Sequence, residues 1–315
     1  MRWGVVATVK ASASDTLRFC AHHLEHGASR ILIYLDAPNP EAEQALLKHP
    51  LCRVQVCDDL YWDATLGKRP AKHQVRQTNN ASHAYARCDD VDWLAHIDVD
   101  EFLIPERTIS ALLADCPTDQ HVLRVRPMEA LAPADAQTDP SAFKCFVPNR
   151  HSQQELLARL YPTYHDQIKG GFLSHLAGKL FVRTGLPNVR LRIHNVLIDG
   201  AENTGQQETK DLKLAHLHAR NWDHWRTLFD FRLEHGSYRA DLAPVQPARS
   251  DSATVHSFLS TLVKTDGEAG LKHFFGEACA DTPDLRARLA HEGLLYTCRL
   301  NFDALVAQHF PSHSF

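Results

Sequence analysis

The feature that most constrains this chain's fold is an alternation of apolar strands and helices over its first 57 residues. Residues 3–9, 30–35 and 54–56 are short apolar runs typical of buried strands. Between them, Leu17, Cys20 and Leu24 recur at helical spacing. Strands joined by helices in this way run parallel in one sheet. The sequence therefore predicts an α/β fold, a Rossmann-type mixed sheet flanked by helices.

The rest of the chain extends this pattern. We predict a loop at 58–70, a helix at 71–88, an irregular segment at 127–178 and a helix at 223–235. Further strands are expected at 93–97, 121–126, 178–183, 189–196 and 212–218. The last 70 residues favour helices. We predict a nucleotide-binding and catalytic domain at 1–240 and a helical C-terminal extension at 241–315, packed on it.

Composition excludes several functional classes. A net charge of -4 argues against a nucleic-acid binder, which needs a basic excess. No apolar run reaches the ~18–20 residues that span a bilayer, so no transmembrane segment is expected. The 8 cysteines include no Cys-x-x-Cys pair and favour reduced thiols. We therefore expect a cytoplasmic protein.

The strongest chemical signal is Asp98-Val99-Asp100-Glu101, directly after the apolar run 93–97. In a continuing strand, Asp98 and Asp100 would point the same way and share one ion. Ligands of open α/β sheets bind at this carboxyl end of the strands. Hard oxygen ligands suit Mg²⁺ or Mn²⁺, with a diphosphate in the remaining positions. The alternative is a solvated acidic loop.

Two histidines give a second signal, because alternation in the strand 212–218 places His216 and His218 on one side. Either imidazole could complete the coordination of the same ion, with His218 preferred and Mn²⁺ favoured over Mg²⁺. The alternative is a pair of structural histidines at a strand end. A metal-dependent hydrolase that uses both histidines with Asp98 is a rival interpretation.

Basic residues in the middle of the chain give a third signal. Alternation would place Arg190, Arg192 and His194 on one strand face, with Lys179 nearby in the sequence. Such a face could neutralise a diphosphate. An ordinary exposed strand face explains the same pattern.

Three segments resemble family 2-like glycosyltransferases of GT-A fold, especially the bacterial branch related to family 92. Residues 19–34 are similar to that branch's first helix and second strand. Residues 93–103, with Asp98-Val99-Asp100-Glu101-Phe102, are similar to its Asp-x-Asp-Glu-Phe strand end. Residues 214–218, followed by Trp225, are similar to its later histidine segment. Ala11-Ser12 and Arg18-Phe19 depart from the branch's usual acidic residues.

The resemblance implies a GT-A-like fold and a metal-dependent glycosyltransferase that takes a sugar from a nucleotide-diphosphate donor. It implies a divalent metal, Mn²⁺ or Mg²⁺, on Asp98 and Asp100, with inversion at the anomeric carbon. Asp36 matches the position that contacts the nucleotide; a turn-forming aspartate explains it equally. For the base that deprotonates the acceptor, the irregular middle offers the following residues, of which we favour Asp166: Glu129, His151, Glu155, His165 and Asp166.

The partners implied are a nucleotide sugar and a saccharide or glycolipid acceptor. Family analogy suggests surface polysaccharide synthesis at the inner face of the membrane, with peripheral contact and no nucleic acid. Retention at the anomeric carbon stays open. Besides the hydrolase, a non-catalytic binding module with the same fold is a second rival.

Overall fold

The computed structural model describes residues 1–135, 137–147, 152–203, 207–245 and 253–313. The chain forms two compact units, each built from separate stretches of sequence. The first comprises Met1–Arg126, Ala177–Leu214 and Asn301–Phe315, and the second comprises Pro127–Leu176 and Ala215–Leu300. The predicted domain boundary at residue 240 stays a prediction.

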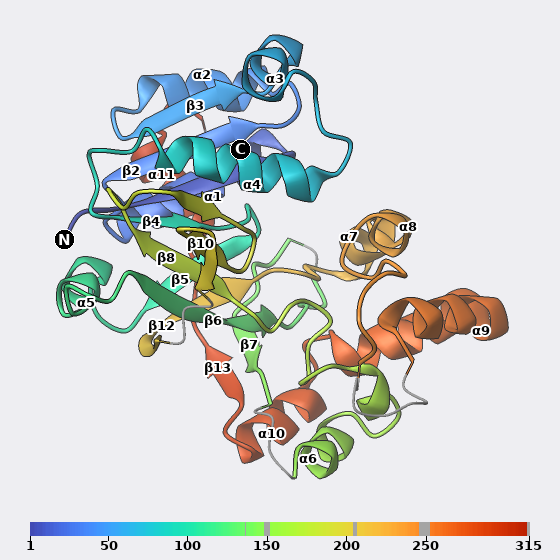
Figure 1. Cartoon of the computed structure of the whole chain (residues 1–315). Helices are drawn as coiled ribbons and strands as arrows, with labels where there is room; N and C mark the ends of the chain where they lie inside the picture. The colour runs from blue at the N-terminus through green and yellow to red at the C-terminus, as the bar shows by residue number, and fades with distance from the viewer. Residues whose placement is uncertain (136, 148–151, 204–206, 246–252, 314–315) are drawn as a thin grey trace. The chain divides into compact units, whose positions relative to one another are not determined.

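The first unit contains a parallel sheet in the order β3-β2-β1-β4 (Figure 1). Its strands are β1 (Trp3–Val9), β2 (Arg30–Leu35), β3 (Cys52–Val56) and β4 (Trp93–His96). β8 (Lys179–Arg183) pairs antiparallel with β4, and β6 (Val122–Ala130) pairs antiparallel with β8. This confirms the predicted α/β class with a Rossmann-type mixed sheet.

Helices of the first unit follow the strands, as predicted. They are α1 (Ala13–Glu25), α2 (Pro40–Lys48), α3 (Asp59–Leu66), α4 (His73–Tyr85), α5 (Ile109–Ala114) and α11 (Phe302–His309). The loop predicted at 58–70 is wrong in part, because α3 lies within it. Asp58 caps α3 by accepting a hydrogen bond from the Tyr61 N–H, and the fully buried Trp62 anchors it.

Two further groups of strands complete the first unit. β12 (Glu208–His216) pairs with β5 (Glu101–Pro105) and β6. A separate three-stranded sheet contains β9 (Val189–Leu191), β10 (Val196–Ile198) and β11 (Ala201–Asn203). The strand predicted at 189–196 is therefore two strands, β9 and β10, joined by a turn in which the Arg192 N–H donates to the Asn195 carbonyl.

The described part of the second unit contains more helix than strand. The last residues of β6 pair with β7 (Ala142–Cys145), which pairs with β13 (Leu295–Thr297). Its helices are α6 (Gln153–Leu160), η1 (His165–Gln167), α7 (Trp222–Thr227), α8 (Phe229–Glu234), α9 (Val255–Ala278) and α10 (Pro283–His291). The predicted helical C-terminal region is confirmed, with β13 as an unpredicted strand. In the described part of the chain, no helix has the length and apolar character needed to cross a bilayer.

Neutral histidines are built into the interface between α1 and β5. His22 and His23 are both buried, and each lies against the Phe102 ring. Burial is the main cause that lowers the pKa of His23 to about 3, and burial also lowers the pKa of His22 well below its usual value. Folding therefore requires both rings to stay neutral.

We expect acid to destabilise the protein through these rings. The pKa of each ring is lower in the folded than in the unfolded chain, so their contribution is complete above about pH 6.5 and is lost as pH falls towards 3. The loss is at most about 1.4 kcal/mol per pH unit for each ring. Urea unfolding at pH 7 and pH 5 measures it. His23→Phe should reduce the difference between the two pH values; an unchanged difference would contradict the assignment.

Candidate active site at the carboxyl edge of the parallel strands

Two acidic residues singled out from the sequence lie where parallel strands end. Asp36 follows β2, and Asp98 follows β4. β1 pairs with both strands and lies between them, so the two carboxylates belong to one edge of the sheet. Ligands of open α/β sheets bind at this edge.

Asp36 is buried and fully engaged by two arginines. The Arg76 guanidinium donates to both carboxylate oxygens, with its Nη2 2.7 Å from Oδ2, and the Arg69 Nη2 lies 2.9 Å from Oδ1. This triad carries a net charge of one positive unit. The sequence interpretation missed both arginines, because it placed Arg69 in a loop and gave the helix at 71–88 no function.

Asp98 is held by a donor at each oxygen. The Gln77 amide nitrogen lies 2.7 Å from Oδ1, and the Lys179 ammonium lies 2.6 Å from Oδ2. About a quarter of the Asp98 side chain is exposed, 27%. Gln77 comes from α4, as does Arg76, so one helix contacts the acids that follow both β2 and β4.

The backbone at Asp98–Glu101 is a turn and not a continuing strand. β4 ends at His96, and the Glu101 N–H donates to the Asp98 carbonyl at 3.0 Å. The prediction that strand alternation aligns Asp98 with Asp100 is therefore wrong. Instead, the Glu101 carboxylate turns inward, is fully buried, and accepts from the Asp98 N–H at 2.9 Å.

Lys179 is a buried cation of the first unit. Its side chain is 1% exposed, and its ammonium lies 3.4 Å from Glu101 Oε2 besides contacting Asp98. Burial alone would lower the pKa of Lys179, but the charges of Asp98 and Glu101 outweigh it and raise that pKa to about 12. The preceding Gly178 has a φ of 71° and approaches β6 so closely that a Cβ would lie 2.1 Å from the Val125 carbonyl oxygen.

His96 is buried beside this ion pair. Its Nδ1 lies 3.2 Å from the Arg192 carbonyl, which can only accept, so Nδ1 carries the proton. Its Nε2 is then an acceptor without a donor among the described residues. Burial, followed by the charge of Lys179, lowers the pKa of His96 to about 4, which keeps the ring neutral.

The donors after β4 fit a hard divalent cation. Asp98, Asp100 and Glu101 place three carboxylates within four residues. Each ionised carboxylate oxygen carries two lone pairs. Asp98 and Asp100 are the residues that would hold Mg²⁺ or Mn²⁺, with hard oxygen ligands.

The predicted diphosphate-binding residues lie in different local settings. Lys179 begins β8, and Arg190 is an exposed residue of β9. Arg192 and His194 lie past the end of β9, in the turn before β10, so the predicted single strand face is wrong. The His194 Nδ1 contacts the Gly178 carbonyl at 2.9 Å, next to Lys179.

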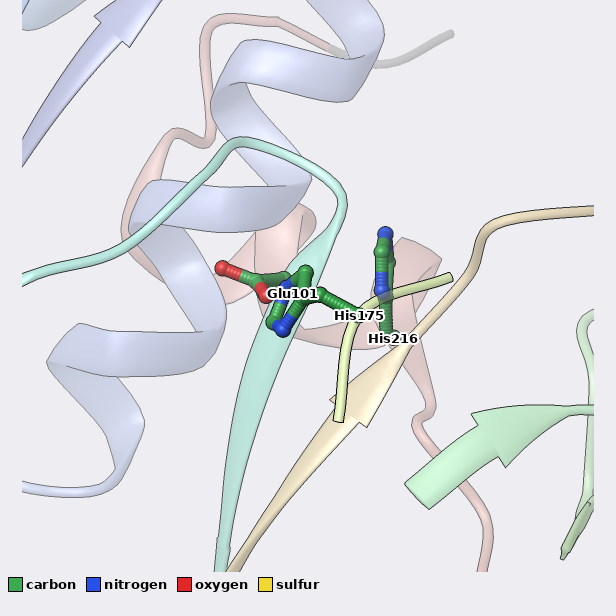
Figure 2. Close-up of side chains that lie close together, drawn as sticks. All are labelled: Glu101, His175 and His216. Carbon is green, nitrogen blue, oxygen red and sulfur yellow. The ribbon is translucent and has the colours of Figure 1, made fainter. Parts of the chain in front are cut away.

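The histidines predicted as late metal ligands belong to the second unit. Figure 2 shows the imidazoles of His175 and His216, whose ring centroids are 5.3 Å apart, and it labels Glu101 at the start of β5. His218 lies past the end of β12, 5.3 Å from His216 between ring centroids, and is buried.

Hydrogen bonds assign the proton of His218. The Trp225 Nε1–H donates to the Tyr238 hydroxyl at 3.0 Å, and that hydroxyl lies 2.6 Å from His218 Nε2. Burial is the main cause that lowers the pKa of His218 well below its usual value. The simplest assignment has the hydroxyl donating to Nε2, with the ring proton on Nδ1. This tautomer leaves His218 no lone pair for a metal, so its predicted role as a metal ligand requires the other tautomer, in which Nε2 carries the proton and Nδ1 binds the ion.

The candidate bases of the second unit differ in exposure. Asp166 lies in η1 with its side chain about half exposed, 3.6 Å from the His165 ring nitrogen. Glu155 lies in the first turn of α6, and His151 is outside the described residues. Glu129 is fully buried against Lys144, which excludes it from contact with an acceptor. Asp166 stays the predicted base.

Two comparisons with known proteins found no match. No family model matches the chain, and no curated protein matches it. The relation to family 92 therefore rests on the three sequence segments alone.

Among solved structures, the galactosyltransferase LgtC in complex with donor and acceptor sugar analogs is similar at 13% identity and a TM-score of 0.26. An active-site mutant of LgtC has 14% identity and the same TM-score. In both cases the match covers 57% of this chain and 57% of LgtC. TarS 1–349 of S. aureus has 11% identity and a TM-score of 0.30, with 99% of this chain and 81% of TarS covered. Likeness at this level does not assign an activity to this chain.

Proposed function

We propose that this protein is a glycosyltransferase that moves a sugar from a nucleotide-diphosphate donor to a hydroxyl of a saccharide or glycolipid. One observation carries the proposal: acids follow β2 and β4 at the carboxyl edge of a β3-β2-β1-β4 sheet, and α4 contacts both. This edge is the ligand-binding position of Rossmann-type sheets.

Charge at the edge supports a diphosphate donor with a divalent cation. Asp98 and Asp100 would hold Mg²⁺ or Mn²⁺, and the ion would stabilise negative charge on the departing diphosphate. The residues proposed to neutralise the diphosphate are Lys179, Arg190, Arg192 and His194. Arg190 and Arg192 are exposed, whereas Lys179 is 1% exposed and would act through its charge without direct contact. His216 and His218 stay proposed as further ligands.

We propose two roles for Asp36: contact with the nucleotide and ordering of the chain beside it. Its carboxylate fixes Arg69 and Arg76, and the Arg76 guanidinium also donates to the Pro70 and Ala71 carbonyls. Asp36 therefore orders the segment 69–76 that leads into α4. Direct nucleotide contact by Asp36 is part of the proposal.

The transfer step is proposed in its inverting form. The acceptor oxygen attacks the anomeric carbon in line as the bond to the diphosphate breaks, and Asp166 takes the acceptor's proton. Retention at that carbon is the alternative. The cellular setting proposed is surface polysaccharide synthesis at the cytoplasmic side of a membrane.

A panel of nucleotide sugars tests the proposal. Thermal unfolding is measured with each sugar nucleotide, with and without Mn²⁺, followed by assay of nucleoside diphosphate release with and without saccharide acceptors. We expect one donor class to raise the unfolding temperature and to be consumed. No shift and no release with any donor would overturn the proposal. Turnover of other substrates with stoichiometric zinc would favour a hydrolase, and donor binding without turnover would favour a binding module.

A further inference from the structure

The Lys179 ammonium contacts the same carboxylate, that of Asp98, to which a divalent cation would bind. Its ammonium is 2.6 Å from Asp98 Oδ2 and 3.4 Å from Glu101 Oε2. The side chain is 1% exposed, so water screens these contacts weakly. An ion bound to Asp98 would share one carboxylate with this fixed positive charge.

Gln77 and Lys179 both donate to Asp98 at similar distances but differ in charge. Gln77 donates at 2.7 Å to Oδ1 and is neutral, whereas Lys179 donates at 2.6 Å to Oδ2 and is positive. Both restrain the carboxylate, and such restraint ordinarily strengthens a metal ligand. Of these two donors, Lys179 is the one that also repels a cation. At a given distance, the repulsion between the ammonium and a divalent ion is twice that between two unit charges.

We propose that Lys179 is a positioning residue that holds Asp98 in place and weakens its affinity for free divalent cations. This inference rests on the proposed function, because it concerns the same Asp98. A diphosphate brings negative charge that offsets the ammonium, so the cation joins the site mainly with the donor. Lys179 thus reduces binding of a divalent ion at Asp98 when no nucleotide donor is present.

Titration of the whole protein with Mn²⁺ alone, followed by electron paramagnetic resonance of the unbound ion, tests this inference without any turnover. We expect Lys179→Met to tighten Mn²⁺ binding at least about tenfold relative to wild type. Gln77→Leu is the matched control, because it removes the other donor without changing charge, and it should not tighten binding. In an Asp98→Asn background, Lys179→Met should lose its effect.

Lys179→Met leaves the buried Glu101 without its cation, so a second pair of variants keeps the test valid if that protein does not fold. Glu101→Gln and Glu101→Gln with Lys179→Met both lack the buried carboxylate. The double variant should bind Mn²⁺ more tightly than Glu101→Gln alone.

Equal or weaker Mn²⁺ binding on loss of Lys179, in the wild-type protein or in Glu101→Gln, would overturn the inference. So would a tightening that persists in Asp98→Asn. These results are separate from the proposed function, which depends on the nucleotide-sugar panel. Failure of that panel would overturn the transferase without changing the Mn²⁺ titration.

Discussion

Asp98→Asn is expected to lower kcat/KM for the preferred nucleotide sugar by about 10²–10³-fold. The amide is close in size to the carboxylate, and its single oxygen can still accept from Lys179 or from Gln77, so the fold should persist. The change removes one negative charge from the turn after β4, where a cation and a diphosphate must be brought together. Release of nucleoside diphosphate measures the effect.

Asp92→Asn is the matched control for this substitution. Asp92 lies on the same segment, but its carboxylate is partly exposed and accepts from the Arg2 N–H at 2.7 Å. It should leave both turnover and thermal unfolding unchanged. Wild-type turnover in Asp98→Asn would contradict the placement of the site.

Lys144→Met is expected to destabilise the protein by about 3–5 kcal/mol. The Lys144 ammonium lies 3.0 Å from Glu129 Oε1 and donates to the Ala278 carbonyl at 2.7 Å. Both side chains are almost completely buried, at 1% and 2% exposure. Removal of the lysine leaves a buried carboxylate that still accepts from the N–H groups of Leu173 and Ser174 but has lost its cation.

Urea unfolding at pH 7 measures this loss, and a second substitution separates charge from packing. Lys144→Met combined with Glu129→Gln removes the uncompensated charge, so it should recover part of the stability. The free energy of unfolding of the double variant should lie between those of wild type and Lys144→Met. A single variant as stable as wild type would show that the pair contributes nothing.

The sequence predicts best those helices and strands whose type is determined by neighbouring residues. β1 and β2 are continuous apolar runs with a helical period between them, so their type and order are fixed by nearby residues. The position of Asp98 after β4 follows from the same logic. The sequence predicts a loop in place of α3 because the apolar residues there do not follow a clear helical period.

The remaining features of the site depend on contacts between distant residues. Lys179 and Asp98 are 81 residues apart, and Arg76 and Asp36 are 40 apart. No spacing rule connects them in a single sequence. The turn between β9 and β10 lacks glycine and proline, so the pattern predicts one strand and a shared face for Arg192 and His194.

The interleaved course of the chain constrains the order in which the first unit can assemble during synthesis. α11, near the end of the chain, supplies Asp303 to Arg18 at 2.7 Å and His309 to Glu25 at 3.1 Å on α1. α1 can therefore form these contacts only after residues 303 and 309 have been synthesised. A ribosome-bound chain that stops at residue 240 would lack α11, so Arg18 and Glu25 of α1 would be exposed without these partners.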